Sequence, residues 1–195
     1  MQKIEVYDDV IPRKHLNFVE ETLLTEKTKW TYYKKTSYAG GNGFDLCDEN
    51  TYDRPFFVHK FLNEKKIVSE HYETLIVPIL KILEEKTGKI LFDRLLRCKA
   101  NLHELTPYHK YCYPHMDDNR SDLTMLLYIT QADGNTVIFN ENIKTYNQFR
   151  GLTVNKEIKP KPGRCIFFDS SYYHCGYPPM IKAPRLLINF VFERE

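Results

Sequence analysis

The chain has 195 residues, of which 42% are hydrophobic and 28% are charged, and its formal net charge is +2. This length and composition are typical of one soluble domain with its own hydrophobic core. The net charge is too small to indicate a nucleic-acid partner by itself, and no apolar run approaches the length that spans a bilayer.

The cysteines and the N-terminal residues bear on the compartment. The five cysteines form no Cys-x-x-Cys pair, and such a dispersed, odd-numbered set is typical of reduced thiols in a cytosol. The first residues, "MQKIEVYDDVIP", become acidic at once and lack the apolar centre of a signal peptide. We therefore expect a cytoplasmic protein, or one in the cytoplasm of a host if a phage encodes it. The cysteines are Cys47, Cys98, Cys112, Cys165 and Cys175.

The N-terminal residues predict a strand, a helix and a second strand. The stretch "KIEVYDDVIP" predicts a short strand and a turn, and Pro12 suits the first turn of a helix that extends to about Leu24. Within it, Leu16, Val19 and Leu23 recur at helical spacing. The basic and aromatic stretch "KWTYYKKTSY" favours an exposed edge strand guarded by lysines over a surface for nucleic acid.

A polar segment over residues 36–54 follows, and it begins with Gly40, Gly41 and Gly43. It is too long for a simple connection between two elements. We expect it to form a mobile lid or to be partly disordered.

The next stretch, "EKKIVSEHYETLIVPILKILEEKTG", predicts one long helix. Ile67, Leu75, Ile79 and Leu83 approximate one apolar stripe along it. Within the same stretch, "VPIL" places a proline where we expect a kink, and "KTG" ends it with a glycine suited to a helix C-terminus.

From Lys89 onward the pattern changes to short β segments, at about 90–104, 123–130, 136–140, 164–168 and 185–193. Turn sequences such as "ADGN" and "KPGR" separate several of them. A helical N-terminal part, about 1–88, thus precedes a strand-rich part, about 89–195. This order predicts one α+β domain built on a β-sandwich or jelly roll.

A candidate metal site begins in "CYPHMDD". In an extended chain residues i and i+2 face the same side, so His115 and Asp117 could bind one ion together. A third ligand is offered by His174, which follows the apolar strand of "GRCIFFDSSYYHCG" through a loop. Two histidines and one carboxylate are the facial set of non-haem Fe(II) oxygenases, although Zn²⁺ would accept the same atoms.

The last strand, "RLLINFVF", carries an arginine and an asparagine on one face of an otherwise apolar segment. Arg185, Leu187, Asn189 and Val191 share that face, and polar groups there would be costly to bury without partners. An arginine is suited to bidentate recognition of a carboxylate. The alternative is an internal salt bridge.

A tyrosine in "LTMLLYIT" offers a second polar group. Tyr128 shares a face with Thr124 and Leu126, and its hydroxyl needs a partner if it is buried. It could donate to the carboxylate that Arg185 binds, or it could simply complete the core. The other histidines lack a partnering pattern, and we interpret them as structural or surface residues: His15, His59, His71 and His109.

The order of His-x-Asp, a strand with tyrosine, "GNTVIF", "PGRCIFFD", a histidine and an arginine resembles the prolyl-4-hydroxylase-like branch of the Fe(II)- and 2-oxoglutarate-dependent oxygenases. The chain looks most like the short versions of tailed phages and marine bacteria. The resemblance extends from "VYDDVIP" to "INFVFE" and is strongest from Lys99 onward. It implies an α+β fold, a double-stranded β-helix (jelly roll) with N-terminal helices packed on one sheet, in a single domain over 1–195.

The resemblance also implies a role for each candidate residue. His115, Asp117 and His174 match the iron ligands. The remaining four match positions around 2-oxoglutarate. Arg185 would pair with the distal carboxylate of 2-oxoglutarate, and Tyr128 would assist it. His103 stands where the family commonly has a tyrosine that lines the pocket. Asn189 stands where relatives use a small polar residue.

The implied cofactor is Fe(II), with 2-oxoglutarate and O2 as co-substrates and succinate and CO2 as products. The leading hypothesis is hydroxylation of a protein or peptide substrate, with proline as one candidate residue. The alternatives are an oxygenase that acts on a small molecule or a nucleobase, and a non-catalytic jelly-roll binding module. Nucleic acid is disfavoured because the lysines at 27–35 and 156–161 are too few to form a basic stripe.

Overall fold

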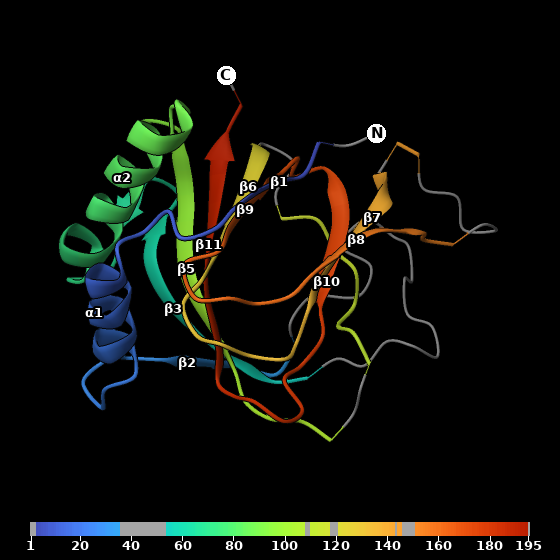
Figure 1. The fold of residues 1–195 in the computed structure, drawn as a ribbon, viewed down its shortest axis with the longest axis horizontal. Coiled ribbons are helices and arrows are strands. Elements are labelled where there is room, and N and C mark those ends of the chain that lie inside the picture. The colour runs from blue at the N-terminus through green and yellow to red at the C-terminus, as the bar shows by residue number, and fades with distance from the viewer. Residues whose placement is uncertain are drawn as a thin grey trace.

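The computed structural model describes residues 3–35, 54–107, 110–117, 121–142, 144–145 and 151–194. Two α-helices and one π-helical turn precede most of the strands in this part of the chain (Figure 1). The elements are β1 (Glu5–Tyr7), α1 (Arg13–Leu23), β2 (Thr31–Tyr33), β3 (Phe56–Asn63), β4 (Lys66–Ile67), η1 (Tyr72–Ile76), α2 (Val77–Thr87), β5 (Leu95–His103), β6 (Ser121–Tyr128), β7 (Thr136–Asn142), β8 (Val154–Ile158), β9 (Cys165–Phe168), β10 (Tyr172–Gly176) and β11 (Arg185–Glu193).

The strands form two antiparallel sheets. The major sheet has the order β1-β9-β6-β11-β5-β3-β2, with β4 paired to β3, and the minor sheet has the order β10-β7-β8. In Figure 1 the two helices lie against one side of the major sheet and the minor sheet lies on its other side. This arrangement confirms the predicted double-stranded β-helix with N-terminal helices on one sheet.

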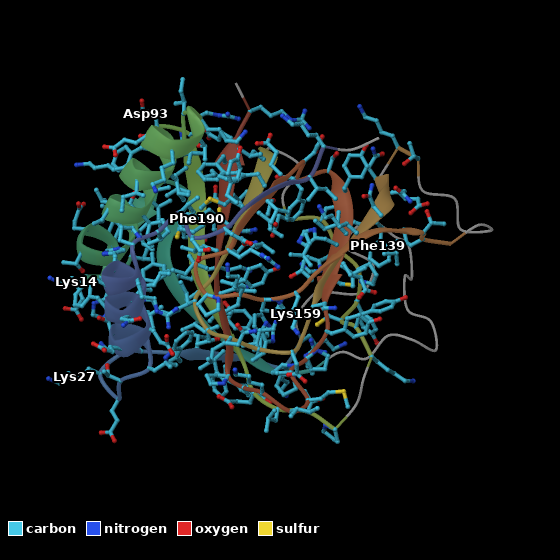
Figure 2. The ribbon with its side chains drawn as sticks, in the orientation of Figure 1. Lys14, Lys27, Asp93, Phe139, Lys159 and Phe190 are labelled. Carbon is cyan, nitrogen blue, oxygen red and sulfur yellow. The ribbon has the colours of Figure 1, made fainter. Side chains whose placement is uncertain are left out.

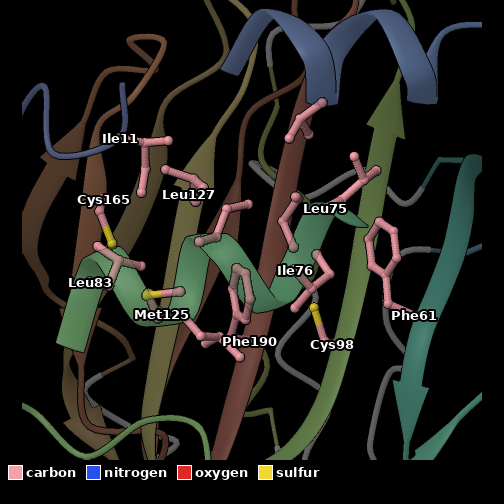
Figure 3. Close-up of a cluster of buried hydrophobic side chains, with 14 of the residues drawn as sticks. Ile11, Phe61, Leu75, Ile76, Leu83, Cys98, Met125, Leu127, Cys165 and Phe190 are labelled. Atoms are coloured by element: carbon pink, nitrogen blue, oxygen red, sulfur yellow. The ribbon is translucent and has the colours of Figure 1, made fainter. Parts of the chain in front are cut away.

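The main hydrophobic core lies between the helices and the major sheet. Strand β11 contributes Phe190 and its even-numbered neighbours to this core, and α2 contributes Leu83 (Figure 3). Met125 of β6 and Cys98 of β5 extend it across the sheet. Burying one such side chain contributes about 1.5–3 kcal/mol, so this layer fixes where β5, β6 and β11 lie.

A second layer of side chains lies on the opposite face of the major sheet. There Leu126, Tyr128 and Leu187 pack with Ile138 of the minor sheet. In Figure 2, Phe190 lies on the helix side and Phe139 lies on the minor sheet. The predicted alternation of β11 is therefore confirmed, because its odd-numbered residues face the space between the sheets.

The predicted long helix from Glu64 is wrong in its first half. Residues 56–63 form the unpredicted strand β3, and β4 follows it as a short hairpin partner. Ile67 belongs to β4 and is 54% exposed, so it is no part of the apolar stripe. Helical structure begins at Tyr72 with a π turn. Just before it, the His71 N–H donates to the Ser69 hydroxyl, and the His71 carbonyl accepts from the Leu75 N–H.

Pro78 lies where the π turn passes into α2, in the first turn of α2, so the helix changes from π to α geometry at the proline. The predicted C-terminal cap is confirmed, since Gly88 adopts φ 67° and donates to the Glu84 carbonyl.

Other sequence predictions have mixed outcomes. Strand β2 lies at the edge of the major sheet as predicted, while β8 and β10 were not predicted. The segment 36–53, His109 and Cys47 lie outside the described residues.

The other four cysteines are free and buried, and burial raises the pKa of Cys98, Cys165 and Cys175, which keeps these thiols protonated. No helix in the described part of the chain has the length and apolarity to span a bilayer.

Candidate metal centre and co-substrate cavity

A cavity lies between the two sheets, and its empty space of about 550 Å³ includes the opening to solvent. Asp117 is the one carboxylate among the described residues that line it. These residues are Arg54, Phe56, Lys99, Asn101, His103, Cys112, His115, Asp117, Leu126, Thr136, His174, Cys175, Gly176, Arg185, Leu187 and Asn189.

Two histidines are held side by side at one end of the cavity. His115 and His174 form an isolated antiparallel bridge with N–H···O distances of 3.0 and 2.9 Å, and their ring centroids are 4.7 Å apart. Asp117 lies two residues beyond, and the ligand atoms of all three side chains lie within 4.8 Å of one another. The three predicted ligands therefore converge. His174 lies on strand β10, which the sequence analysis did not predict.

Backbone carbonyls orient both imidazole rings. Nδ1 of His115 lies 3.0 Å from the Tyr113 carbonyl, and Nδ1 of His174 lies 3.3 Å from the Tyr172 carbonyl. A carbonyl can only accept, so each Nδ1 carries the proton and each Nε2 presents a lone pair. Nε2 of His174 lies 3.5 Å from Oδ2 of Asp117, which places a nitrogen and an oxygen ligand together.

Three donors hold the Asp117 carboxylate. Arg97 Nη2 donates to Oδ1 at 3.2 Å, the Thr124 hydroxyl donates to Oδ2 at 2.9 Å, and the Asn189 amide donates at 3.2 Å. Burial alone would raise the pKa of Asp117, but nearby His174 and the Arg97 charge outweigh it and lower the pKa. The carboxylate is thus ionised and fixed in orientation, as a metal ligand requires.

Burial also fixes the charge state of His115. Loss of solvation, together with neighbouring His174, lowers its pKa to about 4. The ring is therefore neutral near pH 7, which is the form that binds metal. Two imidazoles and one carboxylate suit Fe(II), and they would also suit Zn²⁺.

Arg185 lies at the other end of the cavity, at the start of β11. Its Nε donates to the Gly134 carbonyl at 2.7 Å and its Nη2 donates to the Thr136 hydroxyl at 2.8 Å. Among the described residues no carboxylate pairs with this buried guanidinium. The alternative of an internal salt bridge is therefore not supported, and the guanidinium is available to an anionic ligand.

The Tyr128 hydroxyl lies behind this arginine. It donates to the Thr136 hydroxyl oxygen at 2.6 Å, and the Arg185 guanidinium lies 5.9 Å from the centre of its ring. Burial raises the pKa of Tyr128, so the hydroxyl keeps its proton. Tyr128 does not itself line the cavity, and its link to Arg185 runs through Thr136.

His103 and Asn189 line the cavity as the resemblance implies. His103 stands opposite Arg185 in the sheet and stacks on Phe56, and its Nδ1 is buried without a partner. Burial and the charge of Arg185 lower its pKa well below the usual value, so the ring is neutral. Asn189 Oδ1 is likewise buried and unpartnered. Such orphaned polar atoms fit a polar ligand between Arg185 and the histidine pair.

The comparisons with known proteins agree with this geometry. Residues 100–193, which carry the two histidines, Asp117 and Arg185, match the model of the 2OG-Fe(II) oxygenase superfamily. This segment is similar to the 2OG-Fe(II) oxygenase superfamily, whose members use iron(II), 2-oxoglutarate and O2, and the convergent histidines and carboxylate fit the metal. No curated protein is similar enough in sequence to match the chain.

Solved structures extend the likeness to the whole fold. An oxidoreductase of the 2OG-Fe(II) oxygenase family from Burkholderia pseudomallei is 14% identical with a TM-score of 0.67, over 98% of this chain and 85% of that one. The epimerase SnoN of nogalamycin biosynthesis is 14% identical with a TM-score of 0.64, over 98% and 78%. A Pseudomonas putida prolyl-4-hydroxylase is 11% identical with a TM-score of 0.59, over 100% and 94%. At these identities the likeness shows the fold alone.

The sequence analysis missed one row of polar residues on β5. On β5 the polar Arg97, Lys99 and Asn101 precede His103 on the face toward the second layer, while Cys98 and its even-numbered neighbours enter the main core. The strict alternation in "RCKANLH" could have revealed them. Burial lowers the pKa of Lys99 to about 8, with a further contribution from the Arg97 charge.

Proposed function

We propose that this protein is an Fe(II)- and 2-oxoglutarate-dependent hydroxylase. His115, Asp117 and His174 hold the iron, and Arg185 binds the distal carboxylate of 2-oxoglutarate. The observation that carries this proposal is the placement of both groups in one cavity, with the three ligand atoms within 4.8 Å of one another. When bound, the metal with 2-oxoglutarate and O2 supplies oxidation of a C–H bond, and succinate and CO2 are released.

The chain's own residues position the reactants. Backbone carbonyls of Tyr113 and Tyr172 keep the two histidine Nε2 atoms pointed at the metal position. The Arg185 guanidinium supplies charge-assisted hydrogen bonds at the other end, while His103 Nδ1 and Asn189 Oδ1 offer unpartnered polar atoms between them. The cavity thus holds a short dicarboxylate in one orientation, with its distal carboxylate at Arg185 and its other end toward the metal position.

For the primary substrate we propose a protein or peptide, with proline as the candidate residue. Support comes from the prolyl-4-hydroxylase among the similar folds and from the solvent-open cavity, which leaves room for an extended chain. The second candidate is a small molecule. It is favoured by the fold likeness to SnoN, which has the higher TM-score of the two and whose name identifies it as an epimerase of nogalamycin biosynthesis.

Anaerobic reconstitution tests the metal and co-substrate sites together. Purified protein given Fe(II) and 2-oxoglutarate should develop the weak visible charge-transfer band of the chelate and bind one Fe(II) per chain. The variants His115→Ala, Asp117→Ala and His174→Ala should each lose iron affinity and the band. His71→Ala, a histidine outside the cavity, is the control and should keep both.

Iron affinity equal to wild type in all three ligand variants would contradict the proposed metal site. A screen of succinate formation then tests the substrate. We expect proline-containing peptides to stimulate it more than free proline, DNA or RNA, with a mass gain of one oxygen atom on the peptide. Oxidation confined to a small molecule or a base would contradict the peptide and leave the iron site intact.

A further inference from the structure

One face of β5 carries four polar side chains in succession, Arg97, Lys99, Asn101 and His103, of which the last three line the cavity. Successive members are about 7 Å apart along the strand, because residues two apart share a face. His103 stands opposite Arg185, and Lys99 stands opposite Asn189, which donates to Asp117. Lys99 therefore lies at the metal end of the cavity and not at the Arg185 end.

Lys99 lies among like charges. Lys60 of β3 stands directly opposite it in the sheet, and Arg97 is its neighbour along the same face. Among the described residues, Asp117 is the one carboxylate that opposes its charge, and Lys99 makes no hydrogen bond or ion pair with any of them. Like charges directly opposite each other on a sheet are destabilising, so the fold tolerates this arrangement at a cost.

A second unpartnered donor lies beside Lys99. Nε of Arg97 is buried without a hydrogen-bond partner, while its Nη2 is engaged with Asp117. A buried donor without a partner is rare in native structures, and it indicates a ligand position. Lys99 and Arg97 thus present two donors on one side of the Asp117 carboxylate.

Binding of the metal and the co-substrate would not neutralise the positive charges of Lys99 and Arg97. Iron(II) and the Arg185 guanidinium together carry three positive charges, which Asp117 and the two carboxylates of 2-oxoglutarate offset. Lys99 and Arg54 then remain as further cations in the cavity lining, with Arg97 beside them on the same face of β5, and Asp117 is the one carboxylate among the described lining residues. An anionic group from another molecule would restore the balance.

We propose that Lys99 and Arg97 bind a carboxylate of the primary substrate beside the metal centre. This inference rests on the proposed function, and it narrows the substrate to an organic acid or to a peptide with an acidic residue next to the oxidised one. The chemistry is a charge-assisted hydrogen bond from an ammonium and a guanidinium to one carboxylate. A few cations confined to one cavity wall suit a single anionic group and not a nucleic-acid backbone.

The experiment compares each carboxylate with its amide on the anaerobic Fe(II)·2-oxoglutarate complex. The probes are the capped peptides Glu-Pro-Gly and Gln-Pro-Gly, and L-proline with L-prolinamide. Binding is measured by the perturbation of the visible charge-transfer band. In wild-type protein we expect the carboxylate of at least one pair to bind tenfold or more tightly than its amide, the factor expected for one charge-assisted hydrogen bond.

Variants of Lys99 and Lys66 test which lysine causes the preference for the carboxylate probe over its amide. Lys99→Met should abolish it, Lys99→Arg should restore part of it, and Lys66→Met, which removes an exposed lysine on β4, should leave it unchanged. Preference in the peptide pair identifies an acidic peptide, and preference in the proline pair identifies a small acid. The wild-type comparison stands even if Lys99→Met does not fold.

Two results would overturn the inference. One is equal binding of carboxylate and amide in both pairs. The other is a Lys99→Met protein whose dissociation constant for 2-oxoglutarate rises as much as that for the carboxylate probe, since Lys99 would then serve the co-substrate. Absence of the charge-transfer band in wild-type protein would instead contradict the proposed function, so the two failures are distinguishable.

Discussion

The side-chain amide of Asn189 lies 3.2 Å from Oδ2 and 3.4 Å from Oδ1 of Asp117, so one NH2 group serves both oxygens of the carboxylate. Asn189 is 4% exposed and lies on β11, whereas Asp117 follows the His115 bridge. Strand β11 thereby orients the carboxylate of Asp117, a proposed metal ligand that lies outside the strands and 72 positions away in the sequence. Residues of this kind affect the metal without touching it.

Asn189→Ala should weaken iron binding by about 10–100-fold, the range typical for loss of a partner that orients a ligand. The cause is the loss of a donor to both carboxylate oxygens, which leaves Arg97 and Thr124 to hold Asp117. Anaerobic titration with Fe(II) measures the change. Asn101→Ala is the matched control, because Asn101 lines the same cavity without a bond to Asp117. An equal loss in both variants would contradict a specific role for Asn189.

Arg185→Ala should raise the apparent constant for 2-oxoglutarate by tens-fold or more, since truncating one partner of a buried charge pair costs about 2–5 kcal/mol. Tyr128→Phe should have a smaller effect, because the Tyr128 hydroxyl donates to Thr136 and not into the cavity. Iron affinity should survive in both variants. Binding is followed by the charge-transfer band against 2-oxoglutarate concentration. An unchanged constant in Arg185→Ala would assign the arginine to structure alone.

The sequence predicts local patterns well. The alternation in "RLLINFVF" places Arg185 and Asn189 on one face of β11, and the structure agrees because packing under α2 selects the apolar face. The i, i+2 spacing of His115 and Asp117 brings both side chains to one point. Each of these predictions depends on residues that are neighbours along the chain.

Strand β3 and the partners of Asp117 could not be predicted in the same way. β3 is buried on both faces at several positions, so "FFVHKFLN" shows no clean period of two. The ion pair of Arg97 with Asp117 joins residues 20 positions apart, and it exists because β5 and β6 both pair with β11. Strand order decides such contacts, and one sequence does not display strand order.

Phe190→Ala should destabilise the protein by about 3–5 kcal/mol, because the residue is fully buried under the helices and its truncation leaves a cavity. Phe18→Ala on α1 is the control: Phe18 is 48% exposed, and surface changes cost about 0.5 kcal/mol or less. Chemical denaturation measures both free energies of unfolding. Equal costs would contradict the assigned core.

A cluster around Glu5 makes the anchoring of β1 depend on pH. The Tyr7 hydroxyl donates to its carboxylate at 2.5 Å, and the ammonium groups of Lys89 and Lys3 lie 3.1 and 3.2 Å away. The bond from Tyr7, aided by the two lysines, lowers the pKa of Glu5 from 4.5 to about 2. Because the folded protein has the lower pKa, ionised Glu5 stabilises it above pH 4.5, and this contribution is lost as the pH falls toward 2.

Glu5→Gln should therefore lower Tm at pH 7 by about 1–4 °C, the range expected for a partly exposed ion pair in a protein of this size. The gap between wild type and variant should narrow below pH 4.5 and close near pH 2, where Glu5 is protonated in both states. Tyr7→Phe removes the bond that lowers this pKa most, so it should move the narrowing to higher pH. Thermal unfolding at pH 7, 4 and 3 measures these differences. A Tm gap that stays constant from pH 7 to pH 3 would show that Glu5 contributes through shape and not through its charge.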